Sequence, residues 1–426
     1  MKSEAEPNPG SQSLAKRNLR PIVAGQAVSL FGDYISYFTL PLYVAVLTNS
    51  ESKLSLVAAA ETLPMLLFGL VAGVLLDRVV LRRSLIAADL VRAAAFIGLG
   101  LAISRGVSQW WLALIVAFVV GSMSVVFDSG LQAMLPTALD DSMLVDANSQ
   151  LQLARTVGIT IGPAVGGLLV TWAGGFDTAF YVNAATFIVS AAFLRRVVPF
   201  RAHEPPPRTV FKEEVFGGLK FLWRNMTLRL ATLGGTVTNF VFAPLEALLI
   251  LFVRDRLSGQ IDWPMWVDFM FRDDAEIGMF FAIQAAIASF GVAVAPRVAR
   301  ALRLGRMFVV GLFLMGAGFV LVGISNTFYA VIPAGIALAG VTWVNVAIAT
   351  LRQRIAPPEM LGRVIAASRT LSWIGLPAGA VAGGIIAERV GLVPLYITGS
   401  AVVAVVALAL GFSSLWRYAE PARAKG

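Results

Sequence analysis

The sequence predicts an all-α membrane protein that crosses the bilayer many times, and three observations lead to this prediction. Of the 426 residues, 58% are hydrophobic and only 14% are charged, which is too little polar surface for a soluble fold of this size. The apolar residues gather in twelve stretches, each near the roughly 20 residues that a helix needs to cross a bilayer. Arginine and lysine concentrate in alternate connections between these stretches.

The twelve expected transmembrane helices follow one another in chain order, and the fifth is extended at its polar start. They lie at 21–48, 54–76, 84–104, 109–131, 147–173, 178–198, 229–253, 277–296, 306–325, 328–350, 364–387 and 391–415.

The basic connections predict the topology. They carry Lys16, Arg17, Arg20, Arg78, Arg82, Arg83, Arg195, Arg196, Arg201, Arg208, Lys212, Lys220, Arg224, Arg297, Arg300, Arg303, Arg352, Arg354, Arg363, Arg417, Arg423 and Lys425. The positive-inside rule places this side, and with it both termini, in the cytoplasm. The net charge of +9 is therefore explained by topology, and no nucleic-acid partner is expected.

The chain is expected to divide into two six-helix halves. A cytoplasmic tail at 1–20, without the apolar core of a cleavable signal peptide, precedes the first half at 21–198. The segment 199–228 begins at a proline and ends in a basic amphipathic stretch, which predicts a linker helix on the membrane surface. The second half follows at 229–416 and a short cytoplasmic tail at 417–426.

The supply of reactive residues excludes several functions. The chain has no cysteine and a single histidine, His203, so that thiol chemistry, disulfides and Cys/His metal sites are excluded. No Ser/His/Asp cluster and no phosphate-binding loop is present. We therefore expect no enzymatic activity, no metal and no cofactor.

A run of small residues in the fifth stretch carries the most information. Gly158, Gly162, Gly166 and Gly167 present a smooth helix face on which another helix can approach closely, and Pro163 interrupts the backbone hydrogen bonding there. Simple close packing would explain such a face. The full spacing, however, resembles the motif in the fifth helix of antiporters of the major facilitator superfamily (MFS), which implies export against a proton gradient.

The glycine spacing occurs twice. With one constant offset, Gly158, Gly162, Gly166 and Gly167 superpose on Gly375, Gly379, Gly383 and Gly384. A repeat between two halves is typical of MFS transporters, whose halves are related by an axis along the membrane normal. The resemblance therefore implies the MFS fold.

The connection between the second and third stretches resembles the loop signature of the same superfamily. The matching residues are Gly73, Leu75, Asp77, Arg78, Arg82 and Leu85. Val80 and Leu81 stand where glycine and arginine are usual, so the sequence departs from the signature there. In the family the aspartate helps to latch the two halves together, and a basic turn that only sets topology is compatible with this role.

Further short motifs narrow the resemblance to one branch. They are Phe31-Gly32-Asp33, Leu63-Pro64, Leu135-Pro136, Asp146-Ala147-Asn148-Ser149 and Pro358-Glu359-Met-Leu-Gly362-Arg363-Val364. This set resembles the branch of enterobactin-type siderophore exporters and macrolide efflux proteins. The resemblance implies a bacterial protein of the cytoplasmic (inner) membrane.

Two carboxyl groups are expected near the middle of the bilayer. Asp33 lies about 12 residues into its helix, or ~18 Å deep, and Glu61 about seven residues into the next, or ~10 Å deep. Charge at such depth is costly and is usually kept for function, and desolvation lets a carboxyl group exchange a proton near neutral pH. We expect both to be proton-coupling sites. The alternative for Asp33 is a structural carboxylate that is capped by backbone groups or paired with an arginine.

Other charged residues are expected to pair or to form a gate. Arg92 is the candidate for a buried cation partner. Asp89 stands three residues before it, and the two are expected to satisfy each other on one helix face. Asp128 is assigned to a cytoplasmic gate with Arg78 or Arg155, and Arg369 is expected to help close that side.

Polar and aromatic residues at mid-depth are candidates for a substrate cavity, although any one of them can be a helix-packing residue instead. They are Asn183, Asn239, Gln284, Trp343, Asn345 and Trp373. Aromatic walls with few polar groups suit bulky amphiphilic solutes.

The function expected from these features is proton-coupled export of hydrophobic or amphiphilic small molecules, such as drugs, macrolides or siderophores, by alternating access. The expected partners are the substrate, protons and the lipid bilayer, and the chain is expected to be monomeric. A lipid-handling or uptake facilitator of the same fold is the alternative, and a membrane enzyme or receptor lacks any positive signal.

Overall fold

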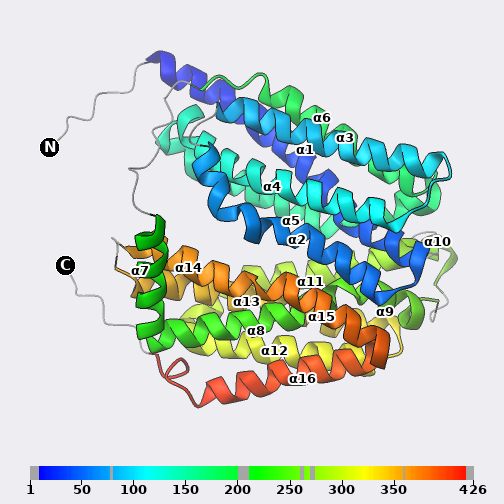
Figure 1. Ribbon diagram of the computed structural model, residues 1–426, viewed down its shortest axis with the longest axis vertical. Helices are drawn as coiled ribbons and strands as arrows, with labels where there is room; N and C mark the ends of the chain where they lie inside the picture. The colour runs from blue at the N-terminus through cyan, green and yellow to red at the C-terminus, as the bar shows by residue number, and fades with distance from the viewer. Residues whose placement is uncertain are drawn as a thin grey trace. The chain divides into compact units, whose positions relative to one another are not determined.

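The computed structural model describes residues 9–76, 80–199, 211–259, 263–268, 274–357 and 360–418. These residues are mostly helical, and no strand occurs among them. In chain order the elements are α1 (Pro9–Thr48), α2 (Glu51–Leu76), α3 (Leu81–Ser104), α4 (Trp110–Ala138), α5 (Asp141–Trp172), α6 (Phe176–Leu194), α7 (Phe211–Arg224), α8 (Met226–Ala247), α9 (Leu249–Phe252), the π-helix η1 (Val253–Leu257), α10 (Met265–Asp268), α11 (Asp274–Leu302), α12 (Leu304–Ile324), the 3₁₀-helix η2 (Phe328–Ala330), α13 (Val331–Ile355), α14 (Leu361–Trp373), α15 (Gly375–Val390) and α16 (Leu392–Gly411) (Figure 1).

The chain forms two compact units. Unit 1 comprises Met1–Leu47 and Ala60–Pro206, and unit 2 comprises Thr48–Ala59 and Pro207–Gly426. The first turns of α2 therefore belong to unit 2, where Ser55 lies against Gly384 of α15. The amphipathic helix α7 also belongs to unit 2, and its Gly218 lies against the backbone of Arg363 in α14.

Ten helices of the described part are long and apolar enough to cross a membrane, or eleven if the bent pair of α8 and 249–257 counts as one span. The expected span at 54–76 corresponds to α2 and is not among them. The structure thus supports ten or eleven of the twelve expected spans, and the number twelve is not confirmed.

Two breaks occur that the expected spans did not contain, and a proline explains the second of them. The expected helix at 229–253 is bent by 44° between α8 and the segment after it, about one turn beyond Pro244. The expected helix at 364–387 is divided at Ile374 into α14 and α15. Pro377 has no N–H to donate to the carbonyl of Trp373, four residues earlier, which weakens the helix at this point.

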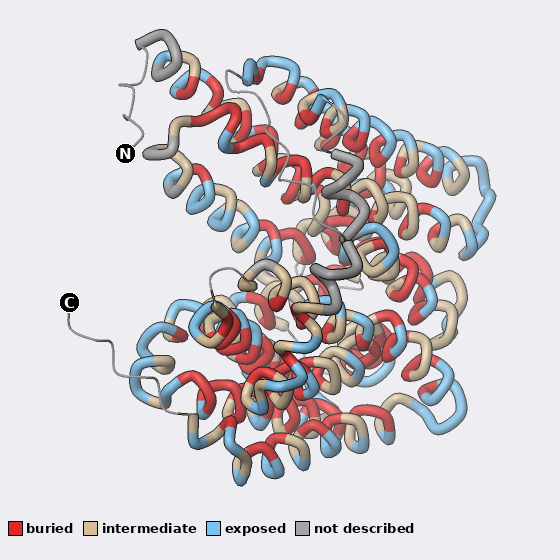
Figure 2. The backbone as a smooth tube through the Cα atoms, turned by 60° about the vertical axis from the view of Figure 1, so that its left-hand side comes forward, coloured by how far each residue is buried: buried red, intermediate tan, exposed pale blue. Residues whose placement is uncertain are grey.

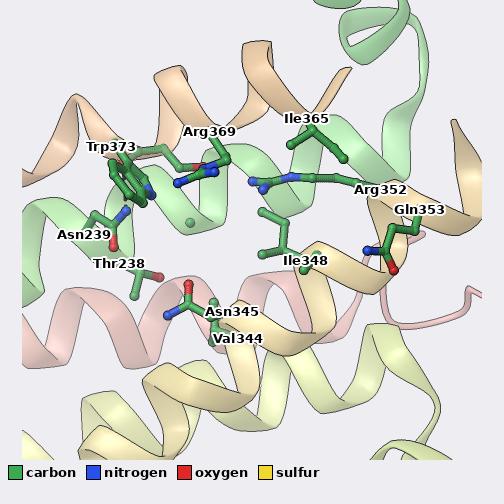
Figure 3. A pocket seen from close by; sticks show the side chains of 13 residues that line it. Thr238, Asn239, Val344, Asn345, Ile348, Arg352, Gln353, Ile365, Arg369 and Trp373 are labelled. Atoms are coloured by element: carbon green, nitrogen blue, oxygen red, sulfur yellow. Dashed lines mark hydrogen bonds between the residues drawn. The ribbon is translucent and has the colours of Figure 1, made fainter. Parts of the chain in front are cut away.

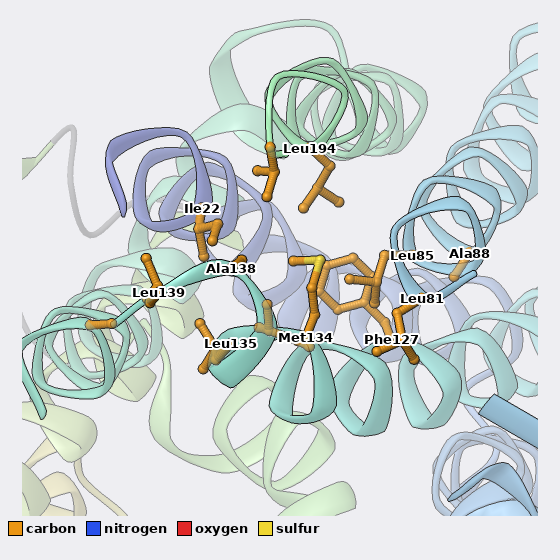
Figure 4. Close-up of a cluster of buried hydrophobic side chains, with 13 residues drawn as sticks. Ile22, Leu81, Leu85, Ala88, Phe127, Met134, Leu135, Ala138, Leu139 and Leu194 are labelled. Carbon is orange, nitrogen blue, oxygen red and sulfur yellow. The ribbon is translucent and has the colours of Figure 1, made fainter. Parts of the chain in front are cut away.

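Each unit buries one side of its helices and exposes the other (Figure 2). Large apolar residues such as Ile115, Phe290 and Phe412 are more than half exposed. Exposed apolar surface of this extent is costly in water and favourable against lipid. Within unit 1, buried side chains from α1, α3, α4 and α6 form a cluster that includes Ile22, Leu85, Phe127, Met134 and Leu194 (Figure 4).

One buried amide joins three chain segments of unit 1. The Nδ2 of Asn18 donates to the carbonyl of Ala138 at 2.9 Å and to that of Val198 at 2.8 Å. Its Oδ1 accepts from the backbone N–H of Val198 at 3.0 Å. Arg82, expected in the loop motif, donates to the neighbouring carbonyl of Val197 at 2.9 Å. These bonds satisfy backbone groups at the end of α4 and just after the end of α6, where helices leave carbonyls unpaired.

The repeated glycines pack in the same way in both units. In unit 1, the glycine face of α5 (Gly158, Gly162 and Gly166) lies against α1, with Tyr34 opposite the first two glycines. In unit 2, the glycine face of α15 (Gly375, Gly379 and Gly383) lies against α8, with Phe240 opposite the first two. A Cβ at Gly162 would stand 2.6 Å from Tyr34, and one at Gly379 would stand 2.0 Å from the carbonyl oxygen of Phe240. Only glycine permits these helices to approach so closely.

Candidate functional site

The charged groups of unit 1 converge on one arginine. Arg92 of α3 is almost completely buried and forms an ion pair with Asp89, whose side chain is fully buried. The guanidinium also lies 3.6 Å from a carboxylate oxygen of Asp33 in α1. The expected Asp89–Arg92 pair is therefore present, and Asp33 is added to it from another helix.

The two acids differ in how far their side chains are exposed. The side chain of Asp33 is 28% exposed, whereas that of Asp89 is 0% exposed. With both carboxylates ionised the cluster carries a net charge of −1, because one arginine serves two acids. Asp33 is the acid that solvent can reach, and its contact with Arg92 is longer than a hydrogen bond.

Aromatic rings enclose the arginine. The guanidinium carbon lies 4.6 Å from the ring centre of Phe127 in α4 and 4.2 Å from that of Phe187 in α6. The face of a phenyl ring attracts a cation without being titratable, and such a contact is worth about 2 kcal/mol when it is desolvated. Ser124 of α4 accepts from the guanidinium at 3.5 Å. Arg92 is thus held from α1, α3, α4 and α6 at once.

Further ionisable groups lie within electrostatic range of this cluster. Glu61, half-buried on α2, is close enough for its charge and that of Asp33 to repel. Gly121 of α4 allows that helix to approach the carbonyl of Glu61. Asp128 of α4 and Arg155 of α5 are both exposed and interact with each other and with Asp33. Arg155, one of the two partners expected for Asp128, is therefore within its electrostatic range, whereas the other, Arg78, lies outside the described residues.

Unit 2 contains a separate feature, a cavity of about 340 Å³ between α8, α13 and α14 (Figure 3). Its polar lining consists mainly of amides and arginines, and one aromatic ring completes it. These residues are Asn239, Asn345, Arg352, Gln353, Arg369 and Trp373. Among the described lining residues there is no carboxylate.

Three of the six expected cavity residues line this cavity, namely Asn239, Asn345 and Trp373. The amide of Asn239 donates to the carbonyl of Ser372 at 2.9 Å, which orients its oxygen. Arg369, expected as a gate residue, also lines the cavity, and its guanidinium lies 4.6 Å from the ring centre of Trp373.

The other three expected cavity residues lie in helix contacts. Asn183 is fully buried and donates to Ser36 at 2.7 Å, which joins α6 to α1. The indole N–H of Trp343 donates to the carbonyl of Gly291 at 2.9 Å, which joins α13 to α11. Gln284 is buried beside Glu246. Asn183 and Trp343 thus satisfy polar groups between helices, and none of the three residues is among the described residues that line the cavity of unit 2.

Some expected residues lie outside the described part. Asp77 and Arg78 are among them, and of Gly73 the structure describes only its place in α2. Pro163 and Gly167 are buried within α5, which continues as a helix through the proline. Within the described ranges no three His, Cys, Asp or Glu side chains come together to hold a metal ion.

Sequence reasoning misses Arg352 as a site residue, and also the two phenylalanines around Arg92. The sequence places Arg352 among the cations of a cytoplasmic connection, yet it is 7% exposed and lines the cavity. Its position at the end of a long apolar helix was the available signal. Phe127 and Phe187 had none, because phenylalanine is common in every apolar stretch of this chain.

Comparison with known proteins identifies relatives along most of the chain. The family model described as Major Facilitator Superfamily matches residues 22–380. Macrolide efflux protein A of Streptococcus pyogenes is 25% identical over 380 residues, which cover 87% of this chain and 89% of that protein. The multidrug efflux pump Tap of Mycolicibacterium fortuitum is 26% identical over 382 residues, which cover 85% of this chain and 87% of the pump.

Solved structures share the fold at low sequence identity. A crystal structure of the nucleoside transporter NupG superposes with a TM-score of 0.72 at 11% identity and covers 94% of this chain and 100% of that one. A bacterial homologue of the iron transporter ferroportin superposes with a TM-score of 0.67 at 15% identity, covering 93% and 99%. At these identities the likeness concerns the fold alone.

Proposed function

Because the chain belongs to the major facilitator superfamily, we propose that it is a proton-coupled exporter of hydrophobic or amphiphilic small molecules. It works by alternating access in the inner membrane of a bacterium, as a monomer with twelve spans and both termini in the cytoplasm. The macrolide and multidrug efflux activities in the names of its relatives support the class of substrate.

One observation supports the coupling to protons, namely that Arg92 contacts both a buried acid, Asp89, and a partly exposed acid, Asp33. Asp89 is fully buried, and its ion pair with Arg92 needs no further partner for charge balance. Asp33 is the additional carboxylate, and its exposed edge can receive a proton. Protonation of Asp33 changes the cluster from a net charge of −1 to neutrality.

The electrostatic energy lost when Asp33 is protonated is large enough to shift a conformational equilibrium. Two unit charges 3.6 Å apart attract by about 5 kcal/mol at an effective dielectric constant of ~20, before any solvent screening. About 5.5 kcal/mol moves a two-state equilibrium from 1:99 to 99:1. An Asp33–Arg92 contact that exists in only one conformation therefore couples protonation to the conformational equilibrium.

Transport into inverted membrane vesicles tests the proposal. We expect a lipophilic dye or a macrolide to accumulate when a pH gradient is imposed, and a protonophore to abolish the accumulation. In the Asp33→Asn variant we expect the gradient to have no effect, while exchange of labelled against unlabelled substrate continues, because exchange needs no net proton movement. Asp255→Asn removes an acid that is exposed on η1 and serves as the control.

Two results would contradict the assignment. Gradient-driven accumulation in Asp33→Asn at the wild-type level would exclude Asp33 as the coupling group. Wild-type accumulation that a protonophore leaves unchanged would indicate a facilitator instead of an antiporter. The Glu61→Gln variant is examined in the same assay, and a normal response to the gradient would remove Glu61 from the coupling site.

A further inference from the structure

The cavity of unit 2 has the properties of an anion-binding site. We propose that it binds the carboxylate or phosphate group of an amphiphilic anion between Arg352 and Arg369 and packs the apolar body of that molecule against the adjoining aliphatic side chains. This inference deepens the proposed export function, on which it rests for the role of the bound molecule.

The first argument is the balance of charge. Arg352 and Arg369 are close enough to repel each other, and both line the cavity, where the guanidinium of Arg352 points toward Arg369 and that of Arg369 toward Trp373 (Figure 3). No carboxylate is found among the described lining residues, and neither arginine forms an ion pair with a described acid. An anion placed between the two cations relieves their repulsion.

The second argument is the burial of Arg352. This residue is 7% exposed, and its Nε has no hydrogen-bond partner. Burying a guanidinium with an unpaired N–H group costs free energy, and a charged acceptor removes that cost. Arginine has a planar array of donors that matches the oxygens of carboxylate and phosphate groups.

The third argument concerns the shape and the remaining lining of the cavity. A volume of about 340 Å³ is near the lower limit for sites that bind small molecules. Val344, Ile348 and Ile365 provide an apolar wall, while Asn345 adds an amide. The guanidinium carbon of Arg369 lies 4.6 Å from the ring centre of Trp373, and this contact orients one of the two cations before an anion binds. The site therefore favours a compact apolar body with one anionic group.

Binding to the purified full-length protein in an uncharged detergent tests this proposal independently of transport. The probes are 2-naphthoate and 2-naphthylmethanol, which share an apolar body and differ in charge, and calorimetry measures their affinities. We expect 2-naphthoate to bind at least tenfold more tightly than the alcohol. In Arg369→Gln and in Arg352→Gln we expect the two affinities to agree within twofold.

Arg306→Gln is the matched control, because Arg306 also lies over a tryptophan ring of unit 2, at 5.4 Å from the ring centre of Trp416, but does not line the cavity. It should retain the preference for 2-naphthoate. Arg369 is exposed to the cavity, so Arg369→Gln still provides the test if Arg352→Gln fails to fold. A wild-type protein without a preference for the anion, or an unchanged preference in Arg369→Gln, would overturn the proposal.

Competition distinguishes the two sources of the anionic group. If dihexanoyl phosphatidate displaces 2-naphthoate and dihexanoyl phosphatidylcholine does not, the site is supported as one for a lipid headgroup. If neither lipid displaces it, the site is supported as one for an anionic solute. If the wild-type protein binds 2-naphthoate but shows no gradient-driven transport in vesicles, the export function is contradicted and the anion site still stands.

Discussion

Replacement of Gly162 by alanine tests whether the glycine face of α5 sets its distance from α1. The new Cβ would stand 2.6 Å from Tyr34 Cβ and 2.9 Å from the carbonyl carbon of Tyr34, whereas ordinary contacts begin at 3.4 Å. The nearer atom must therefore retreat by about 0.8 Å. Because atoms at the base of the side chain and in the backbone are involved, no rotation of a side chain relieves the clash, and α1 itself must move.

The expected cost follows from comparison with a glycine that has space around it. Overpacking typically costs about 1–3 kcal/mol, and involvement of the backbone favours the upper part of that range. A Cβ at Gly98 of α3 would meet nothing within 4 Å, so Gly98→Ala has the same change in helix propensity without the clash. We expect Gly162→Ala to be less stable than Gly98→Ala by about 2–3 kcal/mol.

Unfolding of the purified protein by sodium dodecyl sulfate in mixed micelles measures this difference. A shift of α1 also displaces Asp33, the neighbour of Tyr34, so gradient-driven transport should decrease in Gly162→Ala and remain normal in Gly98→Ala. Equal stability of the two variants would show that the close approach of α5 and α1 does not depend on glycine, and the reasoning from packing would be wrong.

Two further changes probe the polar contacts of unit 1. Asn18→Ala removes three hydrogen bonds and should lower the free energy of unfolding by about 3 kcal/mol. The control Asn148→Ala loses only a bond within its own helix and should change the free energy of unfolding by less than about 0.5 kcal/mol. Similar losses in the two variants would refute the role of Asn18. Arg92→Gln leaves Asp89 buried without its ion pair and should cost about 3–5 kcal/mol in the same unfolding measurement. Adding Asp89→Asn should recover at least half of that loss, and no recovery would mean that the arginine acts mainly through its contacts with the rings.

The sequence predicts much of the helical framework because hydrophobic length and glycine spacing are local signals. The positions of most spans and the repeated glycine faces follow from them. The pair of Asp89 and Arg92 was also predictable, since residues three apart share a helix face. The breaks at Leu248 and Ile374 were not expected, although Pro377, which weakens the helix at the second break, is visible in the sequence.

Contacts between helices could not be predicted in the same way, because they depend on how each helix is rotated. Asn183 and Asn239 are both amides at mid-depth, and only the structure shows that one joins α6 to α1 while the other lines a cavity. The sequence could name Arg92 as the candidate cation partner of the buried acids, but only the structure shows that Asp33 and Asp89 both lie beside it. A single sequence shows which polar and charged groups are available, but tertiary packing determines which of them come into contact.

The two glycine faces have a consequence for how such a protein can diversify. Tyr34 and Phe240 occupy equivalent places opposite the glycines, and the residues directly before them are Asp33 and Asn239. The same interlocking of helices therefore presents an acid in one repeat and a neutral amide in the other. Because assembly depends on the glycines and chemistry on the residue beside the contact, mutation can alter the chemistry of one repeat while its architecture is inherited unchanged.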